Sequence, residues 1–503
     1  MSDERYLCIH GHFYQPPREN PWTDAIEVQP TAQPFHDWNE RITAECYAPN
    51  TAVRLPPSSR HPAPRVVSNY ERMSFNFGPT LLSWMEQHAR PTHDAIIAAD
   101  QASRGHFGGH GSALAQVYNH IIMPLASERD RRTQVRWGLA DFRARFGRAP
   151  EGMWLAETAV DLPTLEALAA EGIAFTILAP RQCQATRPLD SATWSDMSGE
   201  RVDPSRPYLV ALPSGRTIAV FFYDGPISQA VAFEGLLHRG ETFARRLMQG
   251  FSSARTGPQL VHIATDGESY GHHHRGGEQA LAHALDLIAD GGEATLTCYG
   301  QYLERFPPRH EARIWSPSSW SCVHGVERWQ ADCGCRTGGL PGWSQAWRAP
   351  LRTSLVWLRD ELVTRFNVHA RPLLADPWAA RDDYISVLLD PSSLDAFLHR
   401  HATHALSSAE RTRALALLEM QRASLLMFTS CGWFFDELSG LEPLQVLRYA
   451  GHAVQLARQA GGDDLEPELL QRLARAPSNL PAIGNARRLY ETQVLPLRHS
   501  PPV

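Results

Sequence analysis

Residues 1–310 alternate short apolar runs with amphipathic stretches, and this alternation limits the possible folds of the 503-residue chain more than any other feature. Apolar runs of strand length occur at Tyr6–Phe13, Ser74–Phe77, Gly152–Ala156, Ala174–Ala179, Thr217–Tyr223 and Leu260–Thr265. Helical patterns separate them at Glu128–Phe146, Leu162–Glu171, Glu241–Ser252 and Glu278–Ala289. Strand–helix alternation over this length predicts a parallel sheet with helices outside it. A closed or nearly closed barrel fits better than a Rossmann sheet, because no Gly-x-Gly-x-x-Gly motif follows a strand.

The second part of the chain has a different pattern. Long amphipathic stretches at Trp343–Phe366, Ala379–His401, Ala409–Phe428 and Pro443–Ala460 predict an α-helical domain over residues 341–503. Residues 311–340 are rich in Trp, Cys, Gly and His without periodicity and are predicted to connect the two parts. Polar stretches near 20–70 and 183–216 are predicted insertions in the α/β part, and long loops of this kind are usually functional.

Composition excludes several classes of protein. Hydrophobic residues are 43% and charged residues 20%, which is typical of a soluble globular protein, and the net charge of -6 does not favour nucleic acid or an anionic membrane. No run of 18 apolar residues predicts a membrane span. All 48 basic residues are arginine, which excludes Schiff-base and P-loop lysine chemistry. The charged N-terminus and eight scattered cysteines lead us to expect a cytoplasmic, reduced protein of unknown oligomeric state.

Polar residues follow two predicted strands at the ends where α/β proteins place their chemistry. His10 and His12 share one side of the first strand by their period-2 spacing. The apolar run Gln259–Thr265 ends in Asp266 and Glu268, which also share a side and which no packing requirement explains. Two carboxylates this close raise one pKa, which suits a general acid, although a cation-binding or helix-capping pair has the same pattern.

Two further segments are candidate sites. Glu157 closes an apolar strand and precedes a helix for which Asp161 is the predicted N-cap. The alternative is an ordinary surface glutamate at a helix start. Asn119 and His120 precede another apolar run and are candidate site residues, and an ordinary turn is their alternative.

The connecting segment is dense in aromatic and metal-binding residue types. Trp320 and Trp329 are candidate platforms for sugar rings, although more tryptophans pack in cores than bind ligands. Three cysteines and a histidine with the composition of a zinc site follow Trp320: Cys322, His324, Cys333 and Cys335. The usual pair of Cys-x-x-Cys knuckles is missing, and inert thiols are the alternative, so we predict no metal there. We expect the run His272–His274 to make loop and sugar contacts, because three consecutive histidines on a regular element cannot all face one ion.

Taken in order, these segments resemble the motifs of glycoside hydrolase family 57, whose members have a (β/α)7 barrel followed by a helical domain and act on α-glucans. The first, third and fourth motifs of the family are matched by His10–Pro16, Trp154–Glu157 and Asp266–Gly271. The second and fifth are matched more loosely by Tyr118–His120 and Trp320–Asp332. The cysteine-rich run resembles a little-studied subgroup of the family.

The resemblance implies a fold and a mechanism. The fold is α/β, a (β/α)7-type incomplete barrel over residues 1–310 followed by the α-helical domain. Glu157 is the nucleophile and Asp266 the acid/base of a retaining reaction, which requires their carboxyl groups about 5–5.5 Å apart. The implied substrate is an α-linked oligo- or polysaccharide, with no cofactor. The substrate-binding residues are His10, His12, His120, Trp154, Glu268, Tyr270, Trp320, His324, Trp329 and Asp332.

Two other functions stay open at this point. The first is a metal-dependent carbohydrate hydrolase, of the zinc α-mannosidase or deacetylase type, with ligands from His10, His12, Asp266 and His272–His274. The second is a catalytically silent glucan-binding protein, against which the presence of both carboxylates argues.

Overall fold

The computed structural model describes residues 4–57 and 60–499, and their contacts divide the chain into two compact units. The first unit comprises residues up to Gln15, Val28–Val117 and Phe142–Trp320. The second comprises Pro16–Glu27, Tyr118–Asp141 and the residues from Ser321 onward. Two segments from the first third of the chain therefore belong to the same unit as the C-terminal helices, a division that no local sequence pattern indicates.

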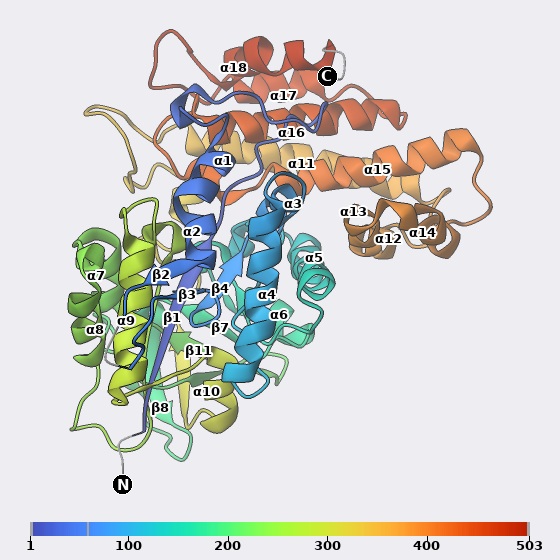
Figure 1. The fold of residues 1–503 in the computed structure, drawn as a ribbon. Helices are drawn as coiled ribbons and strands as arrows, with labels where there is room; N and C mark the ends of the chain where they lie inside the picture. The colour runs from blue at the N-terminus through green and yellow to red at the C-terminus, as the bar shows by residue number, and fades with distance from the viewer. Residues whose placement is uncertain (1–3, 58–59, 500–503) are drawn as a thin grey trace. The chain divides into compact units, whose positions relative to one another are not determined.

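Strand β1 (Arg5–Phe13) lies at the centre of the first sheet (Figure 1). Strand β12 (Gln259–Asp266) runs parallel to it along its whole length, with His12 opposite Asp266. On the other edge, β13 (Thr295–Leu296) pairs with the start of β1 and β4 (Ser74–Phe77) pairs with its end, both in parallel. Nearly every residue of β1 and β12 is buried, as expected for parallel strands covered on both faces.

Parallel contacts continue from β4 through four more strands, all of them predicted except the first. These strands are β5 (Ala115–Gln116), β6 (Met153–Trp154), β7 (Phe175–Leu178) and β11 (Thr217–Phe222). Parallel pairs join β5 to β6 and β7 to β11. Single parallel bridges join Phe75 of β4 to Ala113, just before β5, and Gly152, just before β6, to Phe175 of β7. After β11, the amide of Asp224 donates to the carbonyl of His262 in β12 (2.8 Å), so the series of contacts returns to its beginning.

The two predicted insertions carry secondary structure of their own. The later one forms β8 (Cys183–Pro188), β9 (Ser195–Asp196) and β10 (Tyr208–Ala211), which with β14 (His310–Ile314) extend the sheet beyond β11. The earlier one forms α1 (Trp38–Ile42), a π-helical turn (Thr43–Tyr47), α2 (Ala48–Thr51) and the hairpin β2 (Val53–Leu55) and β3 (Arg65–Val67). The expectation of irregular loops was therefore wrong for much of both segments.

The helices of the first unit follow its strands. They are α3 (Pro79–His88), α4 (Arg90–His106), α6 (Leu162–Ala170), α7 (Gly225–Phe233), α8 (Gly240–Met248), α9 (Gly277–Gly291) and α10 (Tyr299–Arg305), while α5 (Glu128–Phe146) spans the division between the units. The predicted N-cap of α6 is confirmed, since the Asp161 carboxylate accepts from the Thr164 amide at 2.8 Å. Asp224 caps α7 in the same way.

The second unit is helical, as predicted. Its helices after residue 320 are α11 (Arg348–Ala370), α12 (Pro377–Asp383), α13 (Ile385–Leu389), α14 (Leu394–His401), α15 (Ser408–Leu426), α16 (Leu441–Gln459), α17 (Glu466–Leu473) and α18 (Ala486–Gln493). Helix α15 packs against α11 and α16, and a capping box of Ser407 and Glu410 starts it. In the part of the chain that the structure describes, no helix has the length and apolarity needed to cross a membrane.

The prediction of one continuous helix over Ala379–His401 was wrong. The structure divides it into α12, α13 and α14 with a break at Asp390 and Pro391. The Asp390 carboxylate accepts from the Ser392 amide (3.0 Å), and Pro391 restricts the preceding residue to extended backbone, so the helix ends and a new turn begins.

Candidate active site

The carboxyl ends of β1 and β12 place histidines beside carboxylates. His12 is the register partner of Asp266, because the two strands are parallel and in continuous pairing. His10 and His12 are both buried and face the same side of β1, as their spacing predicted. The end of a buried parallel sheet is therefore lined by imidazole and carboxyl groups.

Aromatic rings pack around the two histidines. Trp154, at the end of β6, stacks on His10 (ring centroids 4.9 Å apart) and on His12 (5.0 Å). Trp320 meets Trp154 edge-on at 5.2 Å, and Tyr14 stacks on His12 at 5.9 Å. Stacked and edge-on rings of this kind provide rigid apolar walls on which a sugar ring can pack.

A hydrogen-bond network fixes the protonation of these histidines. His10 Nε2 lies 3.1 Å from Asn76 Oδ1 and its Nδ1 lies 3.1 Å from Ser74 Oγ, while Asn76 Nδ2 donates to His12 Nδ1 (2.9 Å). Asn76 Oδ1 can only accept, so neutral His10 must carry its proton on Nε2 and donate from there. Its Nδ1 then accepts a hydrogen bond from the Ser74 hydroxyl. Burial lowers the pKa of His10 and of His12 to about 3, so both rings are neutral.

Asn76 is a site residue that the sequence analysis missed. It lies opposite His12 in the pairing of β1 with β4, and its Nδ2 also donates to Gln116 Oε1 at 2.7 Å. The signal was present, because an asparagine inside the apolar run Ser74–Phe77 has no packing reason to be there. Gln116, in the two-residue strand β5, offered no pattern from which it could be predicted.

Glu157 lies in a strained turn next to Trp320. Its backbone has φ +57° and ψ +22°, in the left-handed region that non-glycine residues seldom adopt, and Thr158 follows with φ +48°. Trp320 Nε1 donates to Glu157 Oε2 (2.8 Å), and the Trp320 amide donates to the Glu157 carbonyl (3.1 Å). Gln182 anchors Thr158 by two hydrogen bonds of 2.8 and 2.9 Å. Strain held in place by its surroundings is common at functional sites.

The pKa of Asp266 depends on carboxylates from both candidate segments, Glu268 in its own segment and Glu157 in the other. The pKa of Asp266 is raised well above its ordinary value by burial, and further by the negative charges of Glu268 and Glu157. The Asp266 side chain is nonetheless in contact with solvent, so a substrate can reach it. A carboxylic acid that keeps its proton beside an accessible carboxylate is suited to general acid catalysis.

Glu268 is held in place by two hydrogen-bond donors. Tyr47 Oη donates to Glu268 Oε1 (2.5 Å), and so does the amide of Tyr14 (3.0 Å). Burial raises the pKa of Glu268 to about 7, although these donors oppose the shift. Glu268 is only 6% exposed, so it acts on Asp266 through its charge rather than by contact with solvent.

Two glycines give the Asp266–Gly271 turn its shape. A Cβ on Gly267 would lie 2.3 Å from the ring of Phe13, and a Cβ on Gly271, where φ is +148°, would lie 2.5 Å from the carbonyl of Glu45. Phe13 is itself fixed by stacking on Phe77 at 4.8 Å. The turn can therefore approach β1 at Gly267 and the π-helical turn at Gly271 only because side chains are absent there.

We expect Gly267→Ala to lower the urea midpoint of unfolding, with a loss of about 1–3 kcal/mol, because the new methyl group has no space against a buried ring. The matched control is Gly105→Ala, in helix α4, where nothing lies within 4 Å of the added Cβ and helix propensity should raise stability by about 0.5–1 kcal/mol. Equal midpoints for the two variants would contradict this account of the turn.

Tyr270 and the three following histidines make structural contacts. Tyr270 is fully buried and accepts a hydrogen bond from Thr265 (3.3 Å), so its ring supports the turn from below. His272 Nδ1 contacts the Glu45 carboxylate, and His274 Nε2 donates to the carbonyl of Ala232 (3.1 Å). Within residues 4–57 and 60–499, no group of side chains with converging ligand atoms includes His272–His274.

Four of the predicted substrate-binding residues belong to the second unit. His120 is 1% exposed, has φ +52° and lies with its Nδ1 2.6 Å from Ser430 Oγ. Trp329 is fully buried, and Asp332 accepts from the amide of Gln345 at 3.2 Å. His324 lies among three cysteines. Their roles in substrate binding stay predictions.

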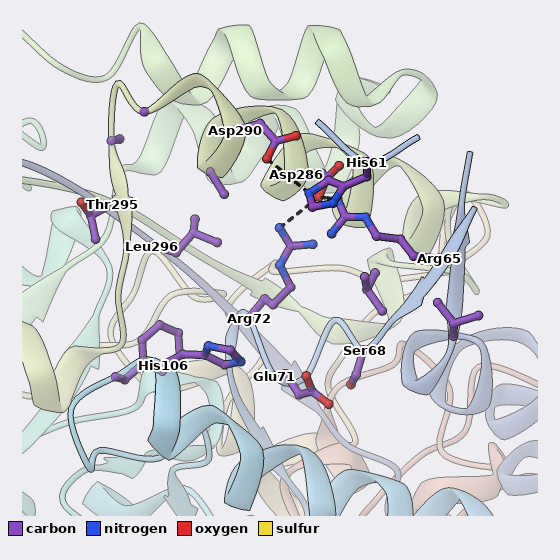
Figure 2. Close-up of a pocket in the computed structure, with 16 residues that line it drawn as sticks. His61, Arg65, Ser68, Glu71, Arg72, His106, Asp286, Asp290, Thr295 and Leu296 are labelled. Carbon is purple, nitrogen blue, oxygen red and sulfur yellow. Dashed lines mark hydrogen bonds and ion pairs between the residues drawn. The ribbon is translucent and has the colours of Figure 1, made fainter. Parts of the chain in front are cut away.

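A cavity of about 610 Å³ lies elsewhere in the first unit, among β3, α4, α9 and β13 (Figure 2). Its charged groups form ion pairs with one another. Asp286 pairs with Arg65 and lies 3.7 Å from Arg72, and Asp290 lies 3.6 Å from His61. Strand β13 pairs with the start of β1, whereas Asp266 lies at its end. None of the predicted site residues lines this cavity, which is therefore separate from the candidate active site at the carboxyl ends of the strands.

A mixed α/β unit with paired carboxylates and stacked aromatic rings at its strand ends has the architecture of a carbohydrate-processing enzyme. Residues 65–314 match the model of glycosyl hydrolase family 57, and residues 343–502 match a domain of unknown function, DUF3536. The chain belongs to glycoside hydrolase family 57, and it is an enzyme of that family's type. The resemblance in the motifs is thereby confirmed at the level of the family.

Solved structures share the fold at low sequence identity. An exo-type maltose-forming amylase from Pyrococcus sp. ST04 is 15% identical with a TM-score of 0.71, over 93% of this chain and 82% of that one. The branching enzyme of Pyrococcus horikoshii is 14% identical with a TM-score of 0.58, over 99% and 98%. The 4-α-glucanotransferase of Thermococcus litoralis is 16% identical with a TM-score of 0.54, over 91% and 60%. No curated protein matches the chain in sequence.

Proposed function

We propose that this enzyme cleaves or transfers α-glucans with retention of configuration, with Glu157 as nucleophile and Asp266 as acid/base. The observation that carries the proposal is the raised pKa of Asp266, to which the charge of Glu157 contributes. One carboxyl group that keeps its proton beside another that is ionised is the pairing a retaining glycosidase needs. The solved relatives with this fold are named as an amylase, a branching enzyme and a glucanotransferase, which supports α-glucan as the substrate class.

The reaction has two steps. The Glu157 carboxylate attacks the anomeric carbon while the glycosidic bond breaks, and Asp266 gives its proton to the departing oxygen. The sugar is then an ester of Glu157 and Asp266 is ionised. In the second step Asp266 takes a proton from water or from a sugar hydroxyl, whose oxygen attacks the anomeric carbon and releases the Glu157 carboxylate. Water gives hydrolysis, and a sugar hydroxyl gives transfer.

The surrounding side chains hold the sugar and prepare the carboxylates. Trp320 donates to Glu157 Oε2 (2.8 Å), which orients the carboxylate for attack. His10 and His12 are neutral and stack with Trp154, so they add hydrogen-bonding groups without a charge that would lower the pKa of Asp266. The negative charge of Glu268, by contrast, raises the pKa of Asp266.

We further propose that the seven parallel strands are a (β/α)7-type barrel and that residues 1–310 form the catalytic part. The returning series of contacts, from β12 through β1, β4, β5, β6 and β7 to β11, supports this arrangement. The active site then lies at the carboxyl ends of the strands, as in other barrels of alternating strands and helices.

The metal-dependent alternative has less support from the geometry. It needs His10, His12 and Asp266 to converge on one ion. Both ring nitrogens of His10 are engaged by Ser74 and Asn76, and in the described part of the chain these residues are not among the groups with converging ligand atoms. Turnover that is unchanged by a chelator, measured while circular dichroism shows that the enzyme is still folded, is therefore the expected result.

The direct test is product analysis on amylose, glycogen and maltooligosaccharides. We expect shorter or redistributed α-glucans whose first-formed reducing ends are the α-anomer, observed by proton NMR before mutarotation. First-formed β-anomers would overturn the retaining mechanism, and inactivity on every α-linked glucan would overturn the substrate class. If all glucans bind without turnover, the catalytically silent protein is the remaining function.

The pH profile tests the role of Glu268. Asp266 must be protonated to donate, so kcat/KM falls as the pH rises through the pKa of Asp266 in the folded enzyme. The charge of Glu268 raises that pKa, so Glu268→Gln is expected to lower it and to move the basic limb of the profile to lower pH. The control is Glu234→Gln, an exposed glutamate of the same unit, for which the limb should not move. A shift to higher pH in Glu268→Gln would contradict the assignment.

A further inference from the structure

Four metal-binding side chains converge in the second unit. The Cys322 and Cys335 Sγ atoms are 3.8 Å apart, and Cys335 Sγ lies 3.7 Å from His324 Nδ1. With Cys333 included, the four ligand atoms all lie within 4.8 Å of one another. The carbohydrate chemistry of the first unit uses none of the three thiols.

These distances match tetrahedral zinc. Zinc–sulfur bonds of about 2.3 Å and zinc–nitrogen bonds of about 2.0–2.1 Å place two sulfur ligands about 3.8 Å apart, and sulfur and nitrogen about 3.6 Å apart. A disulfide needs its sulfur atoms about 2.05 Å apart, and none of the eight cysteines, all of which the structure describes, is in a disulfide. The spacing of the group therefore fits a shared ion better than a cross-link.

The chain path brings the ligands together in two short pairs. Cys322 and His324 form one pair and Cys333 and Cys335 form the other, each separated by a single residue. Gly334, between the second pair, has φ +81°, a conformation that lets both cysteines turn toward the same point. The short helix Glu327–Trp329 lies between the pairs, in place of the longer spacer of a zinc finger.

Two buried arginines hold the ends of this loop. Arg328 donates to the carbonyl of Ser321 (3.0 Å), just before Cys322, and Arg348 donates to the carbonyl of Cys335 (3.1 Å). Both guanidinium groups are buried. A zinc ion with three thiolates and one imidazole has a net charge of -1, which Arg328 can balance, since Arg348 also lies 3.7 Å from the Asp436 carboxylate.

We propose that Cys322, His324, Cys333 and Cys335 bind one zinc ion that stabilises the segment between the two parts of the chain. The site is closed, because four protein ligands complete the tetrahedron and leave no open position for a substrate. Residues 321–347 have little regular secondary structure, and a metal supplies the folding free energy that such a segment lacks. The expectation of no metal, which rested on the missing Cys-x-x-Cys knuckles, is replaced by this proposal.

The test begins with the unmodified full-length chain, purified without chelators. We expect about one zinc per chain by elemental analysis, released when a mercurial reagent blocks the thiols. Cobalt added to the reduced, zinc-free protein should bind at one equivalent and show thiolate-to-cobalt charge transfer with tetrahedral d–d bands. A metal-free protein that also fails to bind cobalt at one equivalent would overturn the proposal, as would a disulfide within the group detected by mass under native conditions.

Cysteine variants test whether a thiol of the group binds the zinc ion or only lies near it. Cys333→Ser removes one ligand, so we expect its zinc affinity to fall by more than the about 10–100-fold typical of lost supporting contacts. The control is Cys431→Ser, a partly exposed cysteine of the same unit outside the group, which should retain about one zinc. Equal zinc content in the two variants would count against the site. Failure of this proposal leaves the glycosidase proposal untouched, because the carboxylate variants are assayed for turnover and not for zinc.

Discussion

Glu157→Gln should lower kcat on maltooligosaccharides by about 10³- to 10⁶-fold, because the amide oxygen is a poor nucleophile and no glycosyl ester can form. Measurement of kcat and KM separately distinguishes this from lost binding, since the amide can still accept the hydrogen bond from Trp320 and KM should change little. Glu234→Gln, an exposed glutamate of the same unit, is the control and should retain full turnover.

A second variant at this position makes the test sharper. The left-handed backbone of Glu157 is one that glycine adopts without strain, so Glu157→Gly should fold at least as stably as the wild type while losing activity. Added azide can then enter the vacated space and attack the anomeric carbon, which should restore turnover and yield a β-glycosyl azide. An α-glycosyl azide, or full activity without azide, would show that Glu157 is not the nucleophile.

Asp266→Asn should lower kcat on maltooligosaccharides by about 10²- to 10⁴-fold, because the departing sugar oxygen then receives no proton. With an aryl α-glycoside whose leaving group needs no protonation, the first step should be nearly unaffected. The second step still needs a base, so the glycosyl ester on Glu157 should accumulate and be detectable by peptide mass. The basic limb of the pH profile should also disappear, because its cause is the ionisation of Asp266.

Asp190→Asn, at an exposed turn of the same unit, is the control for the loss of a carboxylate. Its turnover of both the maltooligosaccharides and the aryl α-glycoside should equal that of the wild type. An Asp266→Asn enzyme that loses the same factor on natural and aryl substrates would point to a positioning role for Asp266 and not to proton transfer.

Much of the site could be predicted from local patterns. His10 and His12 lie in an apolar run of strand length, Glu157 and Asp266 each follow one, and a strand's length and facing are encoded in adjacent residues. Parallel strands end at one edge of a sheet, so residues on these three strands could be expected to meet without knowledge of the strand order. A raised pKa of Asp266 was also expected, because Glu268 lies two residues away, although burial in the folded chain is its largest cause.

Other features depend on contacts between residues far apart in the sequence. The hydrogen bond from Trp320 to Glu157 joins residues 163 positions apart, and the network of Asn76 with His10 joins residues 66 apart. Tyr270 is buried under the turn, and its predicted contact with substrate stays a prediction, because an aromatic residue after an Asp-Gly-Glu motif has the same local pattern in either place.

The sequence by itself therefore determined six of the seven parallel strands, several of the helices and the residue types at the strand ends, since alternation of apolar residues and polar strand ends are local properties. Only the tertiary structure decided that Glu157 adopts a left-handed turn against Trp320 and that Cys322, His324, Cys333 and Cys335 surround one point. The physical reason is the same in each case. The direction of a side chain in an irregular segment is set by distant partners that hold the backbone, and no periodicity in the sequence records them.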